Sequence, residues 1–134
     1  MTFNSDHFDL TNWKLTLPVD AGNGFGGTAV EVKKLVGYEG NHFYDAADGA
    51  MVFRADVAGA TTSGSKYARS ELREMQGSDR AAWTLAEGGT MTATLKVDAV
   101  PVRSDGSEGR VVIGQIHGED EELVRLYWEM ACPH

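Results

Sequence analysis

The sequence predicts an antiparallel all-β sandwich, formed by a single domain over residues 1–134. Several short segments alternate apolar and polar residues with the period of a half-buried strand. Glycine-rich and polar turn signals recur between these segments, and no stretch has the apolar spacing of an amphipathic helix of three turns. At 134 residues and 42% hydrophobic content, the chain can bury a core but is short for two domains.

The first half of the chain contains three expected strands. Residues 13–17 alternate Trp, Leu and Leu with Lys and Thr, and Pro18 ends this strand. The glycine-rich segment 20–27 lacks the strand-to-helix context of a nucleotide-binding motif, so we expect a loop. Residues 30–35 indicate a short strand or turn, and residues 51–55 a further strand.

The second half shows the clearest alternation, in residues 91–98, where one face is apolar and the other polar. The polar run 103–109 predicts a turn, and residues 110–116 follow as the second strand of the same hairpin. Residues 118–121 form another expected turn, which leads into a strand over residues 123–129.

Two short strings carry the chemistry. In the string Arg-Ser-Glu-Leu-Arg-Glu, residues 69–74, strand alternation places Tyr67, Arg69, Glu71 and Arg73 on one face, opposite Ala68, Ser70 and Leu72. In Gln-Ile-His, residues 115–117, Gln115 and His117 point together and Ile116 points into the core. Taken singly, the first pattern is typical of surface ion pairs that contribute little energy, and the second of side chains that only satisfy hydrogen bonds.

Charge and composition limit the classes of partner. The formal net charge of −8 argues against nonspecific nucleic-acid binding. An anionic ligand requires a local basic patch, which Arg69 and Arg73, with Lys66 and Arg125, can supply. The sequence shows neither a membrane-spanning stretch nor a signal peptide, and its single cysteine, Cys132, excludes an intramolecular disulfide.

The two strings occur in order after a third, Asn-Trp-Lys-Leu-Thr-Leu-Pro at residues 12–18, and in this combination the chain resembles the alginate lyases of polysaccharide lyase family 7. The resemblance covers residues 12–129. It implies a concanavalin-like β-jelly-roll whose concave sheet carries the cleft, and cleavage of the uronate polymer alginate by β-elimination. It also implies that no metal or other cofactor is required, and that the protein is secreted or periplasmic.

The resemblance also implies roles for individual residues. Arg69 and Gln115 neutralise the uronate carboxylate, and this stabilises the enolate-like charge of the transition state. His117 accepts the C5 proton, because an imidazole can do so near neutral pH. The expected substrate-binding residues are Glu71, Arg73, Lys66 and Arg125. The isoleucine between Gln115 and His117 is the family variant associated with guluronate-containing blocks.

The sequence departs from the family at its end. The family's proton-donating tyrosine lies in a C-terminal Tyr-x-Lys-Ala-Gly-x-Tyr-x-Gln motif that does not occur here, and the role is not transferred to Tyr38, Tyr44, Tyr67 or Tyr127. We therefore expect a jelly-roll truncated at its C-terminus, able to self-associate through exposed sheet edges. Two alternatives to a lyase remain open, an alginate-binding module without turnover and an inactive fragment.

Overall fold

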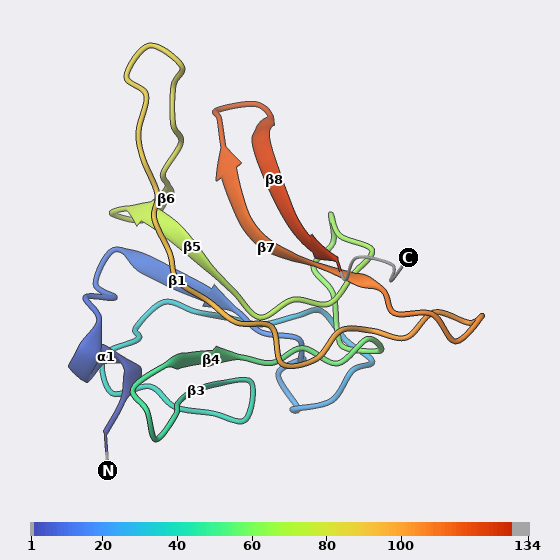
Figure 1. Ribbon diagram of the computed structural model, residues 1–134. Helices are drawn as coiled ribbons and strands as arrows, with labels where there is room; N and C mark the ends of the chain where they lie inside the picture. The colour runs from blue at the N-terminus through green and yellow to red at the C-terminus, as the bar shows by residue number, and fades with distance from the viewer. Residues whose placement is uncertain (1, 130–134) are drawn as a thin grey trace. The chain divides into compact units, whose positions relative to one another are not determined.

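The computed structural model describes residues 2–129, and Cys132 lies outside this range (Figure 1). The chain divides into two compact units, which meet in the sequence between Ala81 and Ala82 and are described separately below. The first unit contains α1 (Asn4–His7), β1 (Trp13–Thr16), β2 (Glu31–Val32), β3 (Phe43–Asp45), β4 (Met51–Phe53), β5 (Glu71–Gln76) and β6 (Asp79–Arg80). The second contains β7 (Arg110–His117) and β8 (Glu122–Glu129). The predicted mostly antiparallel β fold is confirmed, whereas the single-domain prediction stays a prediction.

The main sheet of the first unit has the strand order β2-β1-β5-β6, and every pair is antiparallel. Leu15 of β1 lies opposite Val32 on one side and Leu72 on the other, which puts three aliphatic side chains on the same face. Gly77, with a φ of +63°, allows the tight connection from β5 to β6. β3 pairs with β4 in a separate two-stranded sheet, and of these two strands only β4 was predicted.

The core of the first unit gathers around side chains that the alternation of residues 13–17 points inward. Leu15 and Phe43 are fully buried, and Phe43 packs edge-on against Phe53 at a centroid distance of 5.3 Å. The remaining members of this cluster are Leu10, Leu17, Val19 and Leu35. Burial of this apolar surface is the main stabilising contribution to the unit.

Lys14 departs from the expected inside-outside pattern of β1. Its alternation with Leu15 predicts a solvent-exposed side chain, yet Lys14 is only 7% exposed. Its Nζ donates to Oε2 of Glu31 at 2.7 Å, and this hydrogen bond chiefly holds the pKa of Glu31 below its usual range. A paired ammonium can be buried at far smaller cost than an unpaired one, because the carboxylate replaces the lost hydration.

The expected glycine-rich loop is present and is ordered by one carboxylate. Asp20 accepts hydrogen bonds from the backbone N–H groups of Gly22, Gly24 and Gly27, at 3.0, 2.9 and 2.8 Å. The bonds from Gly24 and Gly27 are the main reason that the pKa of Asp20 is lowered. A side-chain Cβ on Gly27 would approach Cβ of Asp20 to 3.0 Å, so the loop closes tightly on this residue.

The second unit corrects two predictions. Residues 91–98 form no strand, and β7 pairs antiparallel with β8 instead of with that segment. The turn that follows β7 is closed by a bond of 2.7 Å from the Gly118 N–H to the Glu121 carbonyl, so β8 reaches β7 through a much shorter loop. The predicted turn at 103–109 is confirmed by a 2.8 Å bond from the Arg103 N–H to the Ser107 carbonyl.

No helix within residues 2–129 is long and apolar enough to cross a membrane. The single turn α1 was not predicted, and it contains the fully buried Asn4.

Candidate active site

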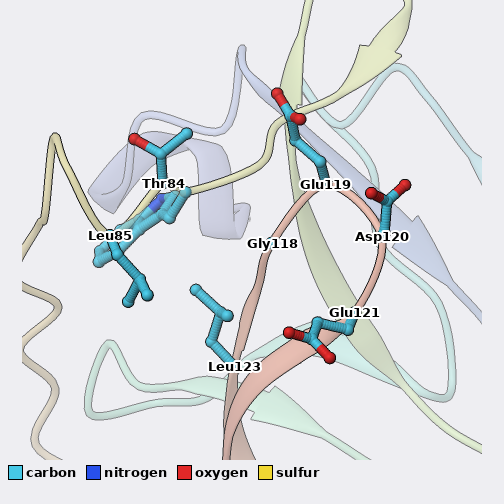
Figure 2. A pocket seen from close by; sticks show the side chains of 8 residues that line it. Thr84, Leu85, Gly118, Glu119, Asp120, Glu121 and Leu123 are labelled. Carbon is cyan, nitrogen blue, oxygen red and sulfur yellow. The ribbon is translucent and has the colours of Figure 1, made fainter.

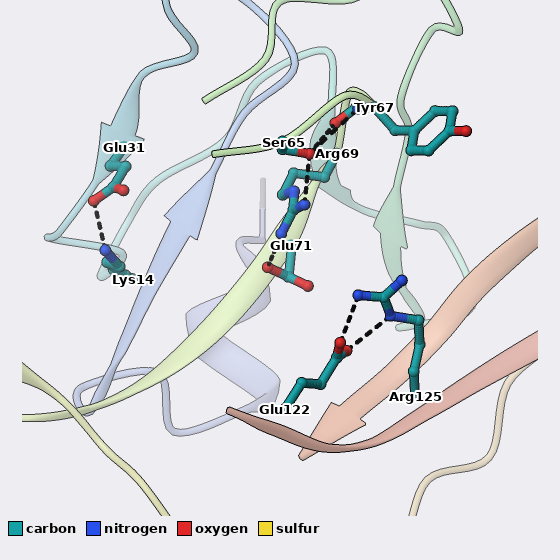
Figure 3. A network of polar contacts seen from close by, with 8 residues as sticks. All are labelled: Lys14, Glu31, Ser65, Tyr67, Arg69, Glu71, Glu122 and Arg125. Atoms are coloured by element: carbon teal, nitrogen blue, oxygen red, sulfur yellow. Dashed lines mark hydrogen bonds and ion pairs between the residues drawn. The ribbon is translucent and has the colours of Figure 1, made fainter. Parts of the chain in front are cut away.

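Arg69 lies just before β5 and is held by two neighbours in the first unit (Figure 3). Its Nη2 donates to the Ser65 hydroxyl at 2.8 Å, and its Nη1 contacts Oε1 of Glu71 at 3.2 Å. The Ser65 hydroxyl is itself fixed, because it donates to the Tyr67 carbonyl at 2.9 Å and accepts from the Tyr67 N–H at 3.2 Å. Within residues 2–129 no acceptor reaches Nε of Arg69, which is buried. The guanidinium is therefore fixed in place and retains a donor.

The predicted division into two faces is confirmed for residues 69–73 and stays a prediction for Tyr67 and Ala68. Ser70 turns away from Arg69 and donates to the His42 carbonyl at 2.7 Å, while Leu72 packs against the core cluster. The strand itself begins only at Glu71, so Tyr67 and Arg69 precede it. The polar and packing faces of residues 69–73 are thus set by alternation, as expected.

Arg73 shares its face with a residue that the site prediction missed. Lys14 lies directly opposite Arg73 in the β1–β5 register, so the buried Lys14 and its more exposed partner Glu31 belong to the same face. Burial, followed by repulsion from Arg80, lowers the pKa of Arg73 from its ordinary value. Lys66, in contrast, is exposed. Lys14 could have been found from the alternation along its strand, which places its side chain on the face opposite the packing residues.

In the second unit, Gln115 and His117 lie on β7 and share one face of the β7–β8 hairpin. Gln115 faces Arg125 across the hairpin, and His117 faces Glu122. The expected pairing of an amide and an imidazole on one face is therefore present. Ile116 and its partner Val124 belong to the opposite face.

Arg125 is firmly held on this polar face. Its Nε donates to Oε1 of Glu122 at 2.8 Å, and its Nη2 contacts Oε2 of the same carboxylate (Figure 3). Its Nη1 donates to the Tyr127 hydroxyl at 3.1 Å. These bonds, the one with Glu122 first, raise the pKa of Arg125. The guanidinium of Arg110 lies over the Tyr127 ring, 4.1 Å from its centroid.

Sequence reasoning missed Arg110, Glu122 and Tyr127 because two irregularities change the strand parity. Val112 pairs with Tyr127 and Gly114 with Leu126, so Ile113 is an extra residue on β7. On β8, Leu123 is extra between Val124 and Glu122. Simple alternation would put Arg110 and Gln115 on opposite faces, and no pattern in the sequence marks the bulges.

A hollow of about 240 Å³ lies beside the end of β7 (Figure 2). It is lined by Trp83, Thr84, Leu85, Gly118, Glu119, Asp120, Glu121 and Leu123. The Trp83 N–H donates to the His117 carbonyl at 2.8 Å, which fixes this segment next to the hairpin. Three carboxylates at the rim repel anions, so this hollow does not suit a carboxylated sugar.

The structure thus brings the predicted residues together in two sets. Arg69, Glu71 and Arg73 gather in the first unit, while Gln115, His117 and Arg125 gather in the second. Their roles stay predictions. Each set combines guanidinium groups with hydrogen-bonding side chains, and the second also supplies an imidazole that can carry a proton.

Comparison with known proteins agrees with these motifs. A family model described as alginate lyase matches residues 8–131. An alginate lyase of Klebsiella pneumoniae is 38% identical over 155 residues, which cover 96% of this chain and 50% of that protein.

Solved structures extend the similarity to the fold. The crystal structure of the alginate lyase from Klebsiella pneumoniae matches with a TM-score of 0.67 at 29% identity, covering 96% of this chain and 54% of the other. Alginate lyase A1-II′, a member of polysaccharide lyase family 7, matches with a TM-score of 0.65 at 27% identity, covering 96% and 56%. A variant of A1-II′ in complex with the substrate GGMG matches with a TM-score of 0.51 at 25% identity, covering 96% and 65%.

The chain spans about half the length of the relatives that it matches, across the part that contains all three of its motifs. Its antiparallel sheets match those of the jelly-roll lyases over that part. From the family model, the identity and the shared fold, the chain belongs to the alginate lyases of polysaccharide lyase family 7.

Proposed function

We propose that the protein cleaves alginate by β-elimination at uronate residues and releases unsaturated oligosaccharides. The observation that carries this proposal is the donor geometry of Arg69. Ser65 and Glu71 fix the guanidinium, and its buried Nε has no acceptor among residues 2–129. Each of the two contacts uses one N–H of a terminal nitrogen, so the second N–H groups of Nη1 and Nη2 are left to donate to a substrate carboxylate from a side chain that is 36% exposed.

The chemistry requires that the uronate carboxylate be neutralised before C5 can lose its proton. Arg69 and Gln115 serve as donors to this carboxylate and stabilise the negative charge that develops as the C5–H bond breaks. His117 takes the proton, the electron pair forms the C4–C5 double bond, and the C4–O bond to the leaving sugar breaks. The leaving oxygen then takes up a proton from a donor that we do not assign to any tyrosine of this chain.

A binding module is the second candidate, favoured by the fixed guanidinium groups of Arg69 and Arg125, which can bind carboxylates without turnover. Glu71, Arg73, Lys66 and Arg125 would hold neighbouring sugars in either case. Because the substrate is a large external polymer, we also propose a secreted or periplasmic location. We also propose that copies of the protein associate with one another through their sheet edges.

The test is the ultraviolet absorbance of the unsaturated uronate product when the purified chain is mixed with alginate. The proposal predicts a steady rise that His117→Ala abolishes while polymer binding is largely kept. His7→Ala, which removes an imidazole from the other unit, serves as the matched control and should leave the rate unchanged. A flat trace from folded wild-type protein that still binds alginate would favour the binding module.

A further inference from the structure

The polar face of the β7–β8 hairpin continues well past the residues assigned to the reaction. Beyond Gln115 and Arg125 it carries Tyr127 and, because of the bulge at Ile113, also Arg110. All of these residues belong to the second unit, so their arrangement depends on the hairpin alone. The question is what ligand this extension suits.

Arg110 differs from the other arginines of the second unit, Arg103 and Arg125, in its electrostatic surroundings. Arg125 is paired with Glu122, and Arg103 lies 3.5 Å from a carboxylate oxygen of Glu129. Within the described part of the chain no carboxylate pairs with Arg110, whose guanidinium lies on the Tyr127 ring. Its register partner Glu129 is the carboxylate that Arg103 contacts, and Arg110 itself is exposed.

Three residues support Arg110 through a chain of contacts, each holding the next. Glu122 holds Arg125 through two nitrogens, and Arg125 donates to the Tyr127 hydroxyl at 3.1 Å, which fixes the plane of the ring. The ring then carries the Arg110 guanidinium at 4.1 Å from its centroid. Stacking leaves the N–H groups at the edge of the guanidinium directed outward, in the forked arrangement that binds a carboxylate.

We infer that Arg110, supported on Tyr127, forms a carboxylate-binding site for a uronate residue of the substrate chain other than the one that reacts. Tyr127 lies two residues along β8 from the partner of Gln115, and His117 lies two residues from Gln115 in the opposite direction. At the rise of an antiparallel strand, this separates the levels of Tyr127 and His117 by roughly 13 Å. That distance is too long for one glycosidic linkage but suits a sugar further along the chain.

This inference rests on the proposed function, since it extends the same substrate along the same face. It predicts that the contribution of Arg110 depends on the length of the ligand. A short oligosaccharide bound at Gln115 and His117 does not reach Arg110, whereas a longer one does. The affinity gained by lengthening the ligand should therefore be lost when the guanidinium is removed.

The experiment measures the dissociation constants of an alginate trisaccharide and an alginate octasaccharide by calorimetry, for wild type and Arg110→Ala. We expect octasaccharide binding to weaken about five- to tenfold, with trisaccharide binding unchanged. Lys96→Ala removes the same charge from an exposed position outside the hairpin and should change neither value. Tyr127→Leu, which removes the ring beneath Arg110, should also weaken octasaccharide binding. Because it also removes the hydroxyl that Arg125 contacts, Tyr127→Phe, which keeps the ring, is its control.

The outcomes separate the two claims. If wild type binds the octasaccharide and Arg110→Ala binds it equally well, this inference is wrong while the proposed function stands. Equal weakening by Arg110→Ala and Lys96→Ala would also overturn it, since the effect would then reflect net charge alone. If folded wild type neither binds nor cleaves alginate, the proposed function fails and the inference fails with it.

Discussion

Gln115 and Arg125 face each other as direct partners in the antiparallel register of β7 and β8. An amide and a guanidinium at this separation can both reach one carboxylate or two on adjacent sugars. Because Glu122 and Tyr127 already fix Arg125, the pair is preorganised, and binding a ligand need not order it. Arg69 is preorganised in the same way, by Ser65 and Glu71.

Replacing Arg69 by lysine should be nearly as damaging as replacing it by alanine. A lysine ammonium is a point charge, so it cannot keep contact with Ser65 and Glu71 while also donating two parallel hydrogen bonds to the substrate carboxylate. We expect the rate of product formation to fall about a hundredfold or more in both variants. Rates within twofold of wild type for Arg69→Lys would show that the arginine is structural, and unfolding curves for each variant serve as the control.

Ser65 should act as a positioning residue for Arg69. Its hydroxyl accepts from Nη2 of Arg69 and is locked by the backbone of Tyr67, so Ser65→Ala loosens the guanidinium without removing it. We expect kcat to fall about three- to tenfold, as for the loss of one orienting hydrogen bond.

Two further variants separate positioning by Ser65 from a general effect on its loop. Ser65→Thr retains a hydroxyl and should restore most of kcat. Ser63→Ala removes an exposed hydroxyl two residues away and should behave as wild type. A change in KM alone, with kcat unchanged, would argue against positioning by Ser65.

Gly59 supports the chain segment that leads into Arg69. A Cβ at this position would lie 2.8 Å from Cβ of Ala68 and 2.9 Å from the Pro18 carbonyl oxygen, so Gly59→Ala must displace its neighbours. We expect a loss of about 1–3 kcal/mol in the free energy of unfolding and a lower kcat. Gly64→Ala is the matched control, because a Cβ there meets no atom within 4 Å. Chemical denaturation compares the two, and equal stabilities would contradict the packing argument.

The Lys14–Glu31 pair should give the protein an acid-sensitive stability. The folded pKa of Glu31 is lowered, chiefly by Lys14, so its contribution is present above the ordinary value near 4.5 and is lost as the pH falls through the folded pKa. Glu31→Gln should cost about 1–3 kcal/mol at neutral pH, because Lys14 stays buried without an anionic partner.

The measurement is the free energy of unfolding of wild type and Glu31→Gln between pH 7 and pH 3. The difference between the two proteins should shrink as the pH falls below 4.5. A constant difference over this range would show that the charge of Glu31 contributes nothing to stability. Lys34→Gln, which alters a nearby charge that neither forms this ion pair nor lowers the pKa of Glu31, provides the control.

The alternation of apolar and polar residues correctly predicted the face of each side chain wherever one strand face is buried and the other is not. Leu15 and Leu72 lie where their period places them, and so do the faces of Arg69 and Gln115. Ile116 takes the face opposite Gln115 as expected, but it does not join the core cluster, and its partner Val124 is 40% exposed. Residues 91–98 show the limit, because an equally clear alternation forms no strand there. Strand pairing is decided by which partner is available in three dimensions, and local periodicity carries no information on that choice.

The candidate site was predictable to the extent that it depends on motifs. Arg69, Gln115 and His117 came from the three strings and their order along the chain. The supports of these residues did not, because Ser65 acts through a loop conformation and Arg110 through a bulge. Such contacts depend on backbone irregularities that no residue pattern marks.

The extra residue at Ile113 has a consequence for how this hairpin can change in evolution. Deleting Ile113 would leave a strand of simple alternation in which Arg110 and Gln115, then four positions apart, still share one face. The bulge thus absorbs one added residue without turning the end of the strand over. Length variation should therefore be tolerated both in the turn at 103–109 and at Ile113.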